Sequence, residues 1–549
     1  MKSKATLVNK KTVLPPKNLL YLYNLFKEKD PLPYSYIEVS GIKGFNKRPH
    51  LKFFTDNLIT YLTRDAMKHS GIYESQDPVQ WNCSWGAPFQ IDKYIECEPW
   101  QKVNHFCGSF LIGRKSELDY RMEELYPLAP ELIDFYPLTF ALPRNRSAFD
   151  SAVTTRRYWI FKLNFSSCGR DIVIYDSTTP ISSLPIDFSE FKGVAQEYIE
   201  KPLTLFGRKF DIRLYVMVTS LRPLKIYLNT QGLVRFCPKP FSFENLNSAS
   251  HLTNFTINKN DPGFVSYSDS KIEFVSDCKW SLRFFLSFLS IQKKIDVSKI
   301  IEDFEKVVIA TLITGGTAIR ICHEPRTKYR KLSYELYGFD ILLDEDFNSH
   351  LMEVNVCPSL SGQPSLMDYN IKYPLNLDLL RLANIIDFDL NEPIEKREKL
   401  KKDIENYEKK FSDSISIERR RAVELNELDP WDSPVFADFE IVRDLIDELV
   451  RKASTPEKSA SVSDYFDVNE ELKISGCKMA KKDEDFKGKF SEKGHFRFIY
   501  PLPENVDKYR CCFKVMRYED IVLQKWIQMT DEEKISIVQS YLLGYEEKY

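Results

Sequence analysis

Residues 209–214 alternate between charged and apolar side chains, in the order K-F-D-I-R-L. In a β-strand successive side chains point to opposite faces of the sheet, so Lys209, Asp211 and Arg213 share one face. The apolar residues between them require a packed layer on the other face. Two interpretations remain open for the charged face: a solvated ladder of ion pairs, or one wall of a site for a charged ligand.

The segments around this strand predict a mixed α/β fold. Apolar residues recur at helical spacing in residues 300–313. Residues 335–343 and 350–355 read as two strands around a turn-forming segment at 344–349. Further β-like runs, punctuated by Pro223 and Gly232, lie at 158–163, 172–175, 211–220, 224–228 and 233–236.

A chain of 549 residues is longer than one hydrophobic core supports, so several folded units are expected. Residues 80–115 are rich in aromatic and turn-forming residues, whereas the sequence from about 391 becomes rich in Glu, Lys and Arg. We expect an N-terminal extension at 1–79, a core at 80–390 (an N-terminal lobe at about 80–155, further lobes at about 156–390), a helical extension at 391–452, a flexible linker at 453–463 and a C-terminal appendage at 464–549.

Composition excludes several classes of protein. Apolar residues make up 43% and the formal net charge is −2, so neither disorder nor a general attraction to nucleic acid or an anionic membrane is indicated. The apolar stretch 274–291 contains three charged residues, too many for a bilayer span, and no signal peptide is expected. Eleven cysteines without a C-x-x-C pair favour free thiols in a reducing compartment. We therefore expect a cytoplasmic protein and, without a heptad seam, a monomer.

Two further patterns suggest a site for phosphate and metal. Asp340 ends one predicted strand motif, and Glu353 and Asn355 lie two residues apart on the next strand. Hard oxygen ligands of this kind suit Mg²⁺, although a hairpin with an acidic turn would also explain them. Lys162 ends a strand ahead of a Ser/Gly loop at 166–170, where a lysine and backbone N–H groups can hold a phosphate.

Taken together and in this order, the motifs resemble those of the tubulin–tyrosine ligase-like family over roughly residues 80–390. They include W-I-x-K at 159–162, Q-E-Y-I at 196–199, K-F-D-I-R at 209–213, H-L-T-N at 251–254, G-F-D at 338–340 and E-V-N-x-x-P-S-L at 353–360. The resemblance implies an ATP-grasp-like fold that holds ATP between two lobes. It also implies that Mg²⁺ bridges the phosphates.

By matching position, the resemblance assigns roles to individual residues. The Mg²⁺ ligands would be Asp340, Glu353 and Asn355. The residues around the transferred phosphate and the incoming amino acid would be Lys209, Asp211, Arg213 and Arg235. The residues that bind ATP would be Lys162, Ser167, Gly169, Arg170, Gln196, Tyr198, Ile199, Lys209, Asp211, Thr253 and Asn254.

Within the family, motifs at 81–86 and 101–115 and the segment 496–526 resemble the tubulin polyglutamylase branch. This implies an ATP-dependent ligase that joins free glutamate to glutamate residues of tubulin C-terminal tails, through an acyl phosphate. An enzyme that binds two acidic substrates needs local positive charge. The expected microtubule-binding residues are Lys401, Lys402, Arg419, Arg420 and Arg421, unless they form only a solvated helix.

The chain departs from the family pattern in the loop after Lys162. Leu163, Cys168 and Asp171 replace an expected Pro, Arg and Gly, and a carboxylate at 171 would repel nucleotide phosphate. An inactive microtubule-binding scaffold is therefore a second hypothesis. A third is a ligase of the same fold that adds glycine or tyrosine, or modifies another acidic protein. The resemblance also implies the cytoskeleton as the cellular location, with the cilium basal body or the centriole among the sites.

Overall fold

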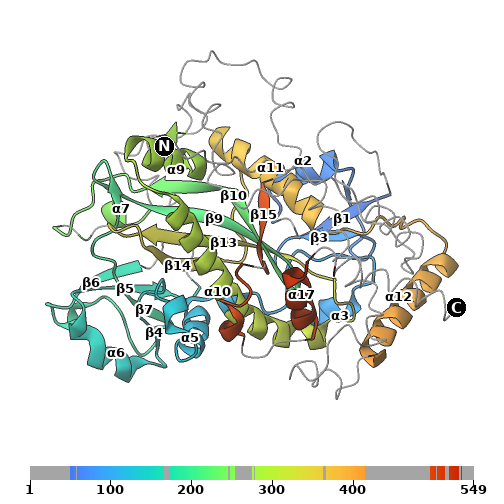
Figure 1. Ribbon diagram of the computed structural model, residues 1–549, viewed down its shortest axis with the longest axis horizontal. Helices are drawn as coiled ribbons and strands as arrows, with labels where there is room; N and C mark the ends of the chain where they lie inside the picture. The colour runs from blue at the N-terminus through green and yellow to red at the C-terminus, as the bar shows by residue number, and fades with distance from the viewer. Residues whose placement is uncertain are drawn as a thin grey trace, which may run out of the picture. The chain divides into compact units, whose positions relative to one another are not determined.

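The computed structural model describes two compact units of the chain (Figure 1). The larger unit comprises residues from 34–392 and 462–515, and the other comprises residues from 1–33, 393–461 and 516–549. The described residues are 50–56, 58–165, 172–244, 246, 248–253, 275–276, 278–362, 366–414, 495–502, 504–513, 518–530 and 533. The predicted linker at 453–463 lies outside these residues.

A small antiparallel sheet with strand order β4-β7-β5-β6 forms one part of the larger unit. On β5, Trp159 and Phe161 point into an aromatic core beneath the sheet. Tyr158, Ile160 and Lys162 alternate with them, so they lie on the opposite face. The strands are β4 (Thr139–Leu142), β5 (Tyr158–Leu163), β6 (Ile172–Asp176) and β7 (Gly193–Glu197).

A larger sheet, with strand order β11-β12-β10-β9-β13-β14, carries the predicted charged strand. All of its strand pairs are antiparallel. The strands are β8 (Thr204–Leu205), which pairs with β9, β9 (Arg208–Leu221), β10 (Leu224–Phe236), β11 (Val275–Ser276), β12 (Lys279–Ser281), β13 (Glu335–Leu343) and β14 (Ser349–Asn355). The mixed α/β class predicted from the sequence is confirmed.

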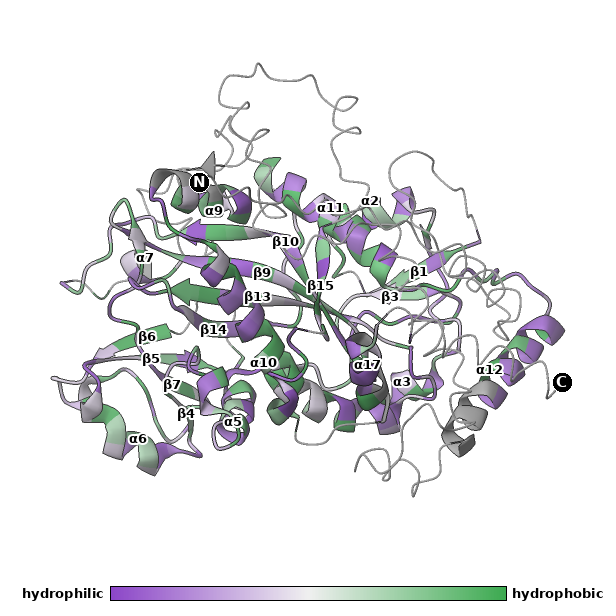
Figure 2. Cartoon of the chain, in the orientation of Figure 1, coloured by the Kyte–Doolittle hydropathy of each residue, from purple (hydrophilic) through white to green (hydrophobic). Residues whose placement is uncertain are grey.

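The two faces of the larger sheet are covered differently. Phe210, Ile212 and Leu214 point into the main core, which also contains α9 (Leu282–Gln292) and α10 (Ser298–His323). In Figure 2, α10 is largely green beside the strands, as expected for a core helix. The helix Ser298–Arg326 is long and apolar enough to cross a membrane by length and composition alone, but 78% of its apolar window is buried in the protein.

The opposite face of the same sheet is divided into an apolar half and a charged half. Tyr215 and Met217 pack in a second core with α11 (Leu366–Leu382) and α2 (Tyr61–His69). The remaining half of that face, from residue 209 to 213, carries the three charged side chains of β9. The alternation along one strand thus places apolar residues in the core and charged residues on the opposite face of the sheet.

The sequence predicted two strands at 224–228 and 233–236, but the structure has one strand, β10, with an irregular register between Leu228 and Gly232. The sequence pattern predicts that Gly232 separates two strands. A Cβ atom at this position would lie 2.7 Å from the backbone oxygen of Arg213. Glycine therefore permits the close approach of two paired strands at an irregularity, rather than a break.

A strand from far along the chain, β15 (Phe496–Tyr500), completes the edge of β10. β12 pairs with β10 at 233–235, and β15 pairs with the same strand at 226–229. Ile499 and Tyr500 enter the main core. The described part of the expected C-terminal appendage thus contributes a strand to the larger sheet.

Residues 50–79, expected as part of an N-terminal extension, also contribute ordered elements. β1 (Lys52–Thr55) pairs in parallel with β2 (Tyr73–Glu74) and β3 (Cys83–Trp85). The other helices of the described residues are α3 (Ile91–Glu96), α4 (Phe110–Gly113), α5 (Lys115–Leu125), α6 (Arg146–Ala152), α7 (Ser248–His251), α12 (Ile394–Ser414) and α17 (Tyr518–Gln528), the last two in the other unit.

Candidate functional site

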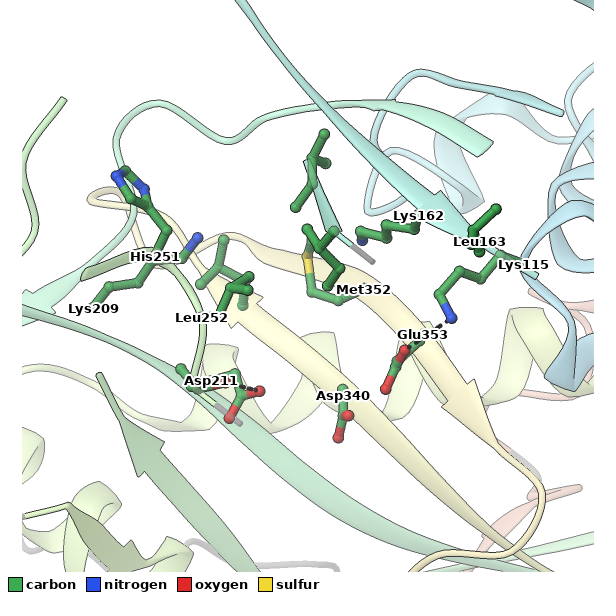
Figure 3. Close-up of a pocket in the computed structure, with 14 residues that line it drawn as sticks. Lys115, Lys162, Leu163, Lys209, Asp211, His251, Leu252, Asp340, Met352 and Glu353 are labelled. Carbon is green, nitrogen blue, oxygen red and sulfur yellow. Dashed lines mark hydrogen bonds and ion pairs between the residues drawn. The ribbon is translucent and has the colours of Figure 1, made fainter. Parts of the chain in front are cut away.

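A pocket lies where residues of the small sheet face the charged half of the larger sheet (Figure 3). It holds about 720 Å³ of empty space, open solvent included. Its lining residues are Lys115, Ile160, Lys162, Leu163, Ile172, Lys209, Asp211, His251, Leu252, Thr253, Asp340, Leu342, Met352 and Glu353.

Lys162 enters the pocket from the small sheet and is oriented by a chain of hydrogen bonds. Its Nζ donates to Oε1 of Gln196 at 2.7 Å, and Nε2 of Gln196 donates to Oγ1 of Thr139 at 2.9 Å. These residues come from β5, β7 and β4, so the chain crosses the sheet. Thr139 fixes the amide orientation of Gln196, because the amide nitrogen donates to the hydroxyl and the oxygen is left to accept from the lysine.

Burial lowers the pKa of Lys162 to about 7. This value includes the effect of neighbouring charges: Lys115 and Lys209 also lower the pKa, and Glu353 and Asp340 raise it. A lysine in this state gains its charge most easily when an anion is close to it. The pocket therefore favours a polyanionic ligand beside Lys162.

Lys209 enters from the larger sheet. Its Nζ donates to the hydroxyl of Tyr198 at 2.8 Å and lies 4.3 Å from the centre of the tyrosine ring. Burial lowers the pKa of Lys209 to about 8, against the opposing influence of Cys237 and Asp211. The solvated ladder considered for the 209–213 face is thus wrong, because Lys209 is 8% and Arg213 9% exposed.

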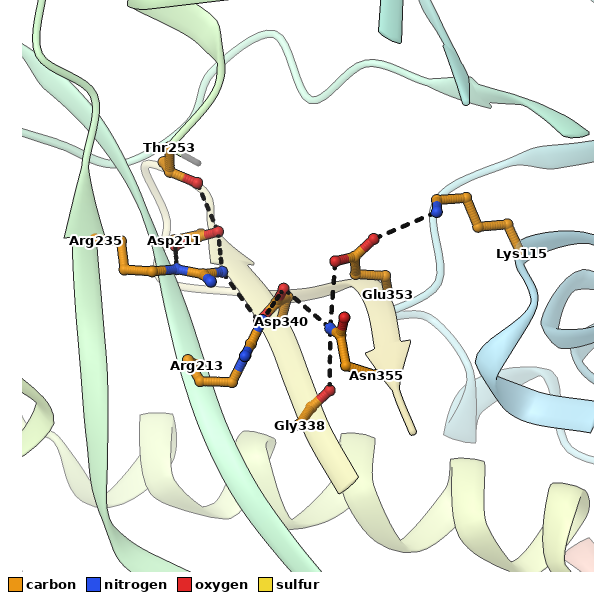
Figure 4. Close-up of polar contacts among 9 residues, drawn as sticks. All are labelled: Lys115, Asp211, Arg213, Arg235, Thr253, Gly338, Asp340, Glu353 and Asn355. Atoms are coloured by element: carbon orange, nitrogen blue, oxygen red, sulfur yellow. Dashed lines mark hydrogen bonds and ion pairs between the residues drawn. The ribbon is translucent and has the colours of Figure 1, made fainter. Parts of the chain in front are cut away.

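Two arginines hold the carboxylates in the middle of the sheet (Figure 4). Arg235 donates through Nε and Nη2 to the two oxygens of Asp211, at 2.7 and 2.6 Å, and its Nη2 lies 3.0 Å from Oδ1 of Asp340. Arg213 makes a two-pronged ion pair with Asp340, with Nη2 donating to Oδ2 at 2.8 Å. Thr253 donates from Oγ1 to Oδ2 of Asp211 at 2.7 Å.

Burial alone would raise the pKa of Asp340, but Arg213 and Arg235 outweigh it and hold the pKa well below its usual range. Asp340 is therefore ionised at neutral pH although it is buried. Its charge is available to a cation that approaches from the pocket.

Asp340 and Glu353 are direct cross-strand partners on β13 and β14. Nδ2 of Asn355 donates to Oδ2 of Asp340 at 3.3 Å and to Oε1 of Glu353 at 3.2 Å, and Nζ of Lys115 lies 3.5 Å from Oε2 of Glu353. Two carboxylates opposite each other repel unless a cation lies between them. The carboxylate oxygens suit Mg²⁺, and the Asn355 amide would have to turn over for its oxygen to join them, because its nitrogen faces both carboxylates.

Among the described residues, no group of three or more His, Cys, Asp or Glu side chains could hold a metal ion, and the set considered in this pocket has only two carboxylates and one amide. Both oxygens of Asp340 already accept from Arg213 or Arg235. Oδ1 accepts from Arg213 and Arg235, and Oδ2 accepts from Arg213 and Asn355, so both lone pairs of each oxygen are used. Turning the Asn355 amide would free one lone pair of Oδ2 for a metal. The residues present fit a magnesium ion on this condition.

The structure does not describe several residues of the predicted ATP site: Ser167, Gly169, Arg170 and Asn254. Tyr198 is buried and Ile199 is half-buried, directly after β7. Of the predicted tubulin-binding residues, Lys401 is partly exposed and Lys402 exposed on α12, and Arg419, Arg420 and Arg421 lie outside the described residues. The roles assigned to all these residues remain predictions.

Two polar residues of the pocket were not among the predicted site residues. Lys115 is the first residue of α5 and meets Glu353 from a distant part of the sequence. His251 lies at the pocket beside Leu252. Both belong to motifs recognised in the sequence, the I-G-R-K run at 112–115 and the H-L-T-N run at 251–254, so motif position was the available signal.

The fold and pocket define a mixed α/β protein whose cleft combines buried lysines with paired carboxylates, as a polyanion and a divalent cation require. The profile of the Tubulin-tyrosine ligase family matches residues 93–392. The chain belongs to this family.

Relatives in the family share about a third of their residues with this chain. It is 30% identical over 465 residues to tubulin polyglutamylase ttll-4 of Caenorhabditis elegans, covering 82% of this chain and 68% of the relative. It is 31% identical over 375 residues to tubulin monoglutamylase TTLL4 of Homo sapiens, covering 66% of this chain and 30% of the relative. It is 32% identical over 342 residues to tubulin polyglutamylase TTLL6 of Mus musculus, covering 60% and 40% respectively.

Proposed function

We propose that this protein is an ATP-dependent tubulin polyglutamylase, which joins free glutamate to glutamate residues of tubulin tails. The observation that carries the proposal is the pocket itself, where Lys162 and Lys209 face Asp340 and Glu353. Family membership and the activities for which the relatives are named support glutamate transfer to tubulin. The small and larger sheets would be the two lobes of an ATP-grasp-like fold.

Each group of pocket residues has a separate task in this proposal. Lys162 and Lys209 would hold the phosphates of ATP by charge-assisted hydrogen bonds from both sides of the cleft. Asp340, Glu353 and Asn355 would hold Mg²⁺, which when bound offsets charge on the phosphoryl group. The tasks of this chain are therefore binding, orientation and charge stabilisation.

The two arginines would bind the transferred phosphate and the incoming amino acid. Arg213 and Arg235 are buried cations next to the proposed metal ligands. In the proposed reaction a glutamate carboxylate oxygen attacks the γ-phosphorus, and ADP leaves. The amine nitrogen of the second reactant then attacks the acyl carbon, inorganic phosphate leaves and the amine loses a proton. No nucleophilic side chain of the protein is needed.

The acidic tubulin tail requires local positive charge on a chain whose net charge is −2. Lys401 and Lys402 on α12 are accessible candidates. We place the protein in the cytoplasm and on the cytoskeleton, where this substrate occurs, with the cilium basal body or the centriole among the sites. We propose that it acts there as a monomer.

The proposal is tested by transfer of labelled glutamate to purified tubulin with Mg·ATP. Glu353→Gln keeps the shape of the side chain and removes one metal-binding charge. Glu345→Gln is the matched control, because Glu345 lies on the same hairpin, is exposed and pairs with Lys201 at 2.6 Å. We expect transfer by the parent and the control, and none by the Glu353 variant.

The competing hypotheses predict other outcomes. If the parent binds microtubules but transfers no glutamate to any tubulin, the scaffold hypothesis is correct and the enzyme proposal is wrong. Transfer of glycine or tyrosine in competition with glutamate would identify a ligase of another specificity. Equal activity of the Glu353 and Glu345 variants would exclude the proposed metal site.

A further inference from the structure

A buried chain of hydrogen bonds joins Lys209 to Tyr198, on the other side of the pocket, and continues from Tyr198 to His251. Nζ of Lys209 donates to the hydroxyl of Tyr198, whose oxygen lies 2.7 Å from Nδ1 of His251. Nε2 of His251 lies 3.0 Å from the backbone oxygen of Ser242. Tyr198 and His251 are only 3% and 2% exposed. The role assigned above to Lys209 does not explain why it is held by this chain.

The partners at the two ends fix the direction of every hydrogen bond. An ammonium group only donates and a backbone carbonyl only accepts. Nε2 of His251 must therefore carry the proton that Ser242 accepts, and in the neutral ring Nδ1 is left to accept from Tyr198. Burial raises the pKa of Tyr198 well above its usual value, so its hydroxyl keeps the proton that it donates.

The chain connects elements that are separate in the fold. Tyr198 directly follows β7 of the small sheet, whereas Lys209 lies on β9 of the larger one. The segment 251–253 is attached to β9 directly through Thr253, which donates to Asp211, and indirectly through the Tyr198 hydroxyl, which pairs with both His251 and Lys209. Residues 251–253 are thus linked to two neighbouring charged residues of the pocket wall, to Asp211 through Thr253 and to Lys209 through Tyr198.

This arrangement controls where Lys209 points. Asp211 lies two residues away on the same face and attracts Lys209 electrostatically. The hydroxyl of Tyr198 provides an acceptor on the other side, and the tyrosine ring adds an attraction to the ammonium group. Without the hydroxyl, Lys209 would turn toward Asp211 and its charge would be offset by the carboxylate.

We propose that His251 is a positioning residue for nucleotide binding, which orients the hydroxyl of Tyr198 and thereby keeps Lys209 directed into the pocket. The proposal rests on the proposed function only in taking ATP as the ligand. A purely structural histidine would fill the aromatic cluster of Tyr198, Phe241 and Phe243 without affecting Lys209. The positioning role requires the hydrogen bond between Tyr198 and Nδ1 of His251, whereas the structural role does not.

Two amide substitutions separate these bonds. His251→Asn places an amide oxygen near the position of Nδ1 and keeps an acceptor for Tyr198. His251→Gln places an amide nitrogen near Nε2 and keeps only the donor to Ser242. Tyr198→Phe removes the hydroxyl and keeps the ring. The full-length protein and these variants are compared by calorimetric titration with Mg²⁺ and a non-hydrolysable ATP analogue, without tubulin.

We expect Tyr198→Phe and His251→Gln each to raise the dissociation constant about tenfold, the effect of one hydrogen bond to a charged group. Combined, they should cause no further loss, because both remove the same link. His251→Asn should bind close to the parent. In the transfer assay the KM for ATP should rise while the KM for glutamate stays the same.

Three results would overturn the inference: unchanged binding by Tyr198→Phe, equal binding by the Asn and Gln variants, or additive losses in the double variant. Thermal unfolding of each variant shows whether a loss reflects misfolding, and the Asn variant remains informative if Gln misfolds. A parent that binds no nucleotide would also overturn it. A parent that binds nucleotide but transfers no glutamate would refute the proposed activity and leave this inference standing.

Discussion

Raising the pH from about 7.5 to about 9 should weaken ATP binding, because Lys162 has a pKa of about 7 in the protein without nucleotide. Bound phosphate raises the pKa of a neighbouring lysine, so binding takes up a proton and affinity falls as the pH rises above the pKa of the unbound state. The protonated fraction of Lys162 falls from about one quarter to about one hundredth, which predicts a roughly 25-fold loss of affinity.

Lys209 adds to this effect. Burial gives it a pKa of about 8, so its protonated fraction falls from about three quarters to about one tenth, roughly an eightfold further loss. The charged groups around Lys162 have opposing effects: Glu353 and Asp340 favour its charge, and Lys115 opposes it. Because the charge of Lys209 lowers the pKa of Lys162, the two losses are not independent, and the net expectation lies between about 25-fold and about two hundredfold.

Calorimetric titration with the ATP analogue at each pH measures this loss. Repeating it in two buffers of different ionisation enthalpy measures the protons taken up on binding. Lys162→Arg is the control, because arginine stays charged over this pH range. Between the two pH values this variant should lose affinity only about eightfold, which is the loss caused by Lys209. Equal affinity at both pH values, or no proton uptake, would refute the assignment of Lys162 as a buried, largely neutral phosphate ligand.

Three further predictions concern the same unit. Asp211→Asn removes the charge that Arg235 contacts at 2.7 and 2.6 Å, so Arg235 should turn to Asp340 and the Mg²⁺ needed for half-maximal transfer should rise about tenfold; an unchanged requirement would contradict it. His105→Ala leaves Glu335, which accepts from the imidazole at 2.6 Å and is fully buried, without its cation, and should cost about 3–5 kcal/mol in denaturant unfolding. Ile499→Ala should cost about 2–5 kcal/mol, because this residue of β15 is fully buried in the main core, and a melting temperature equal to that of the parent would show that β15 does not stabilise the unit.

Much of the local structure could be predicted from the sequence because it depends on neighbouring residues. The strand at Tyr158–Leu163 has the predicted bounds, and β13 matches the predicted 335–343. The alternation at 209–214 correctly divided β9 between a core face and a charged face. The spacing of Glu353 and Asn355 placed both on one side of β14, where Nδ2 of Asn355 reaches Glu353. Each of these features follows from the period of a single strand.

The two separate strands predicted around Gly232 were wrong, and the helix predicted at 300–313 was confirmed but too short, because a local signal can have more than one cause. Gly232 marks an irregularity within β10 and not the end of a strand, since glycine occurs in both places. The helix predicted at 300–313 extends over Ser298–His323. Gly315 and Gly316 do not end it, because they lie inside it where Ile112 and Leu224 pack closely against the helix. Close packing made glycine acceptable at positions where propensity alone disfavours a helix.

What the sequence by itself determined is therefore the inventory of the site: which strands carry charge, and which carboxylates and lysines face the same way. Only the tertiary structure decided their partners. Arg235 bridges Asp211 and Asp340, although 105 positions separate Arg235 from Asp340 in the sequence. His251 reaches Lys209 through Tyr198, and β15 completes an edge of β10. The physical reason is that side-chain direction follows from the geometry of one strand, whereas contact between distant segments depends on how whole layers pack.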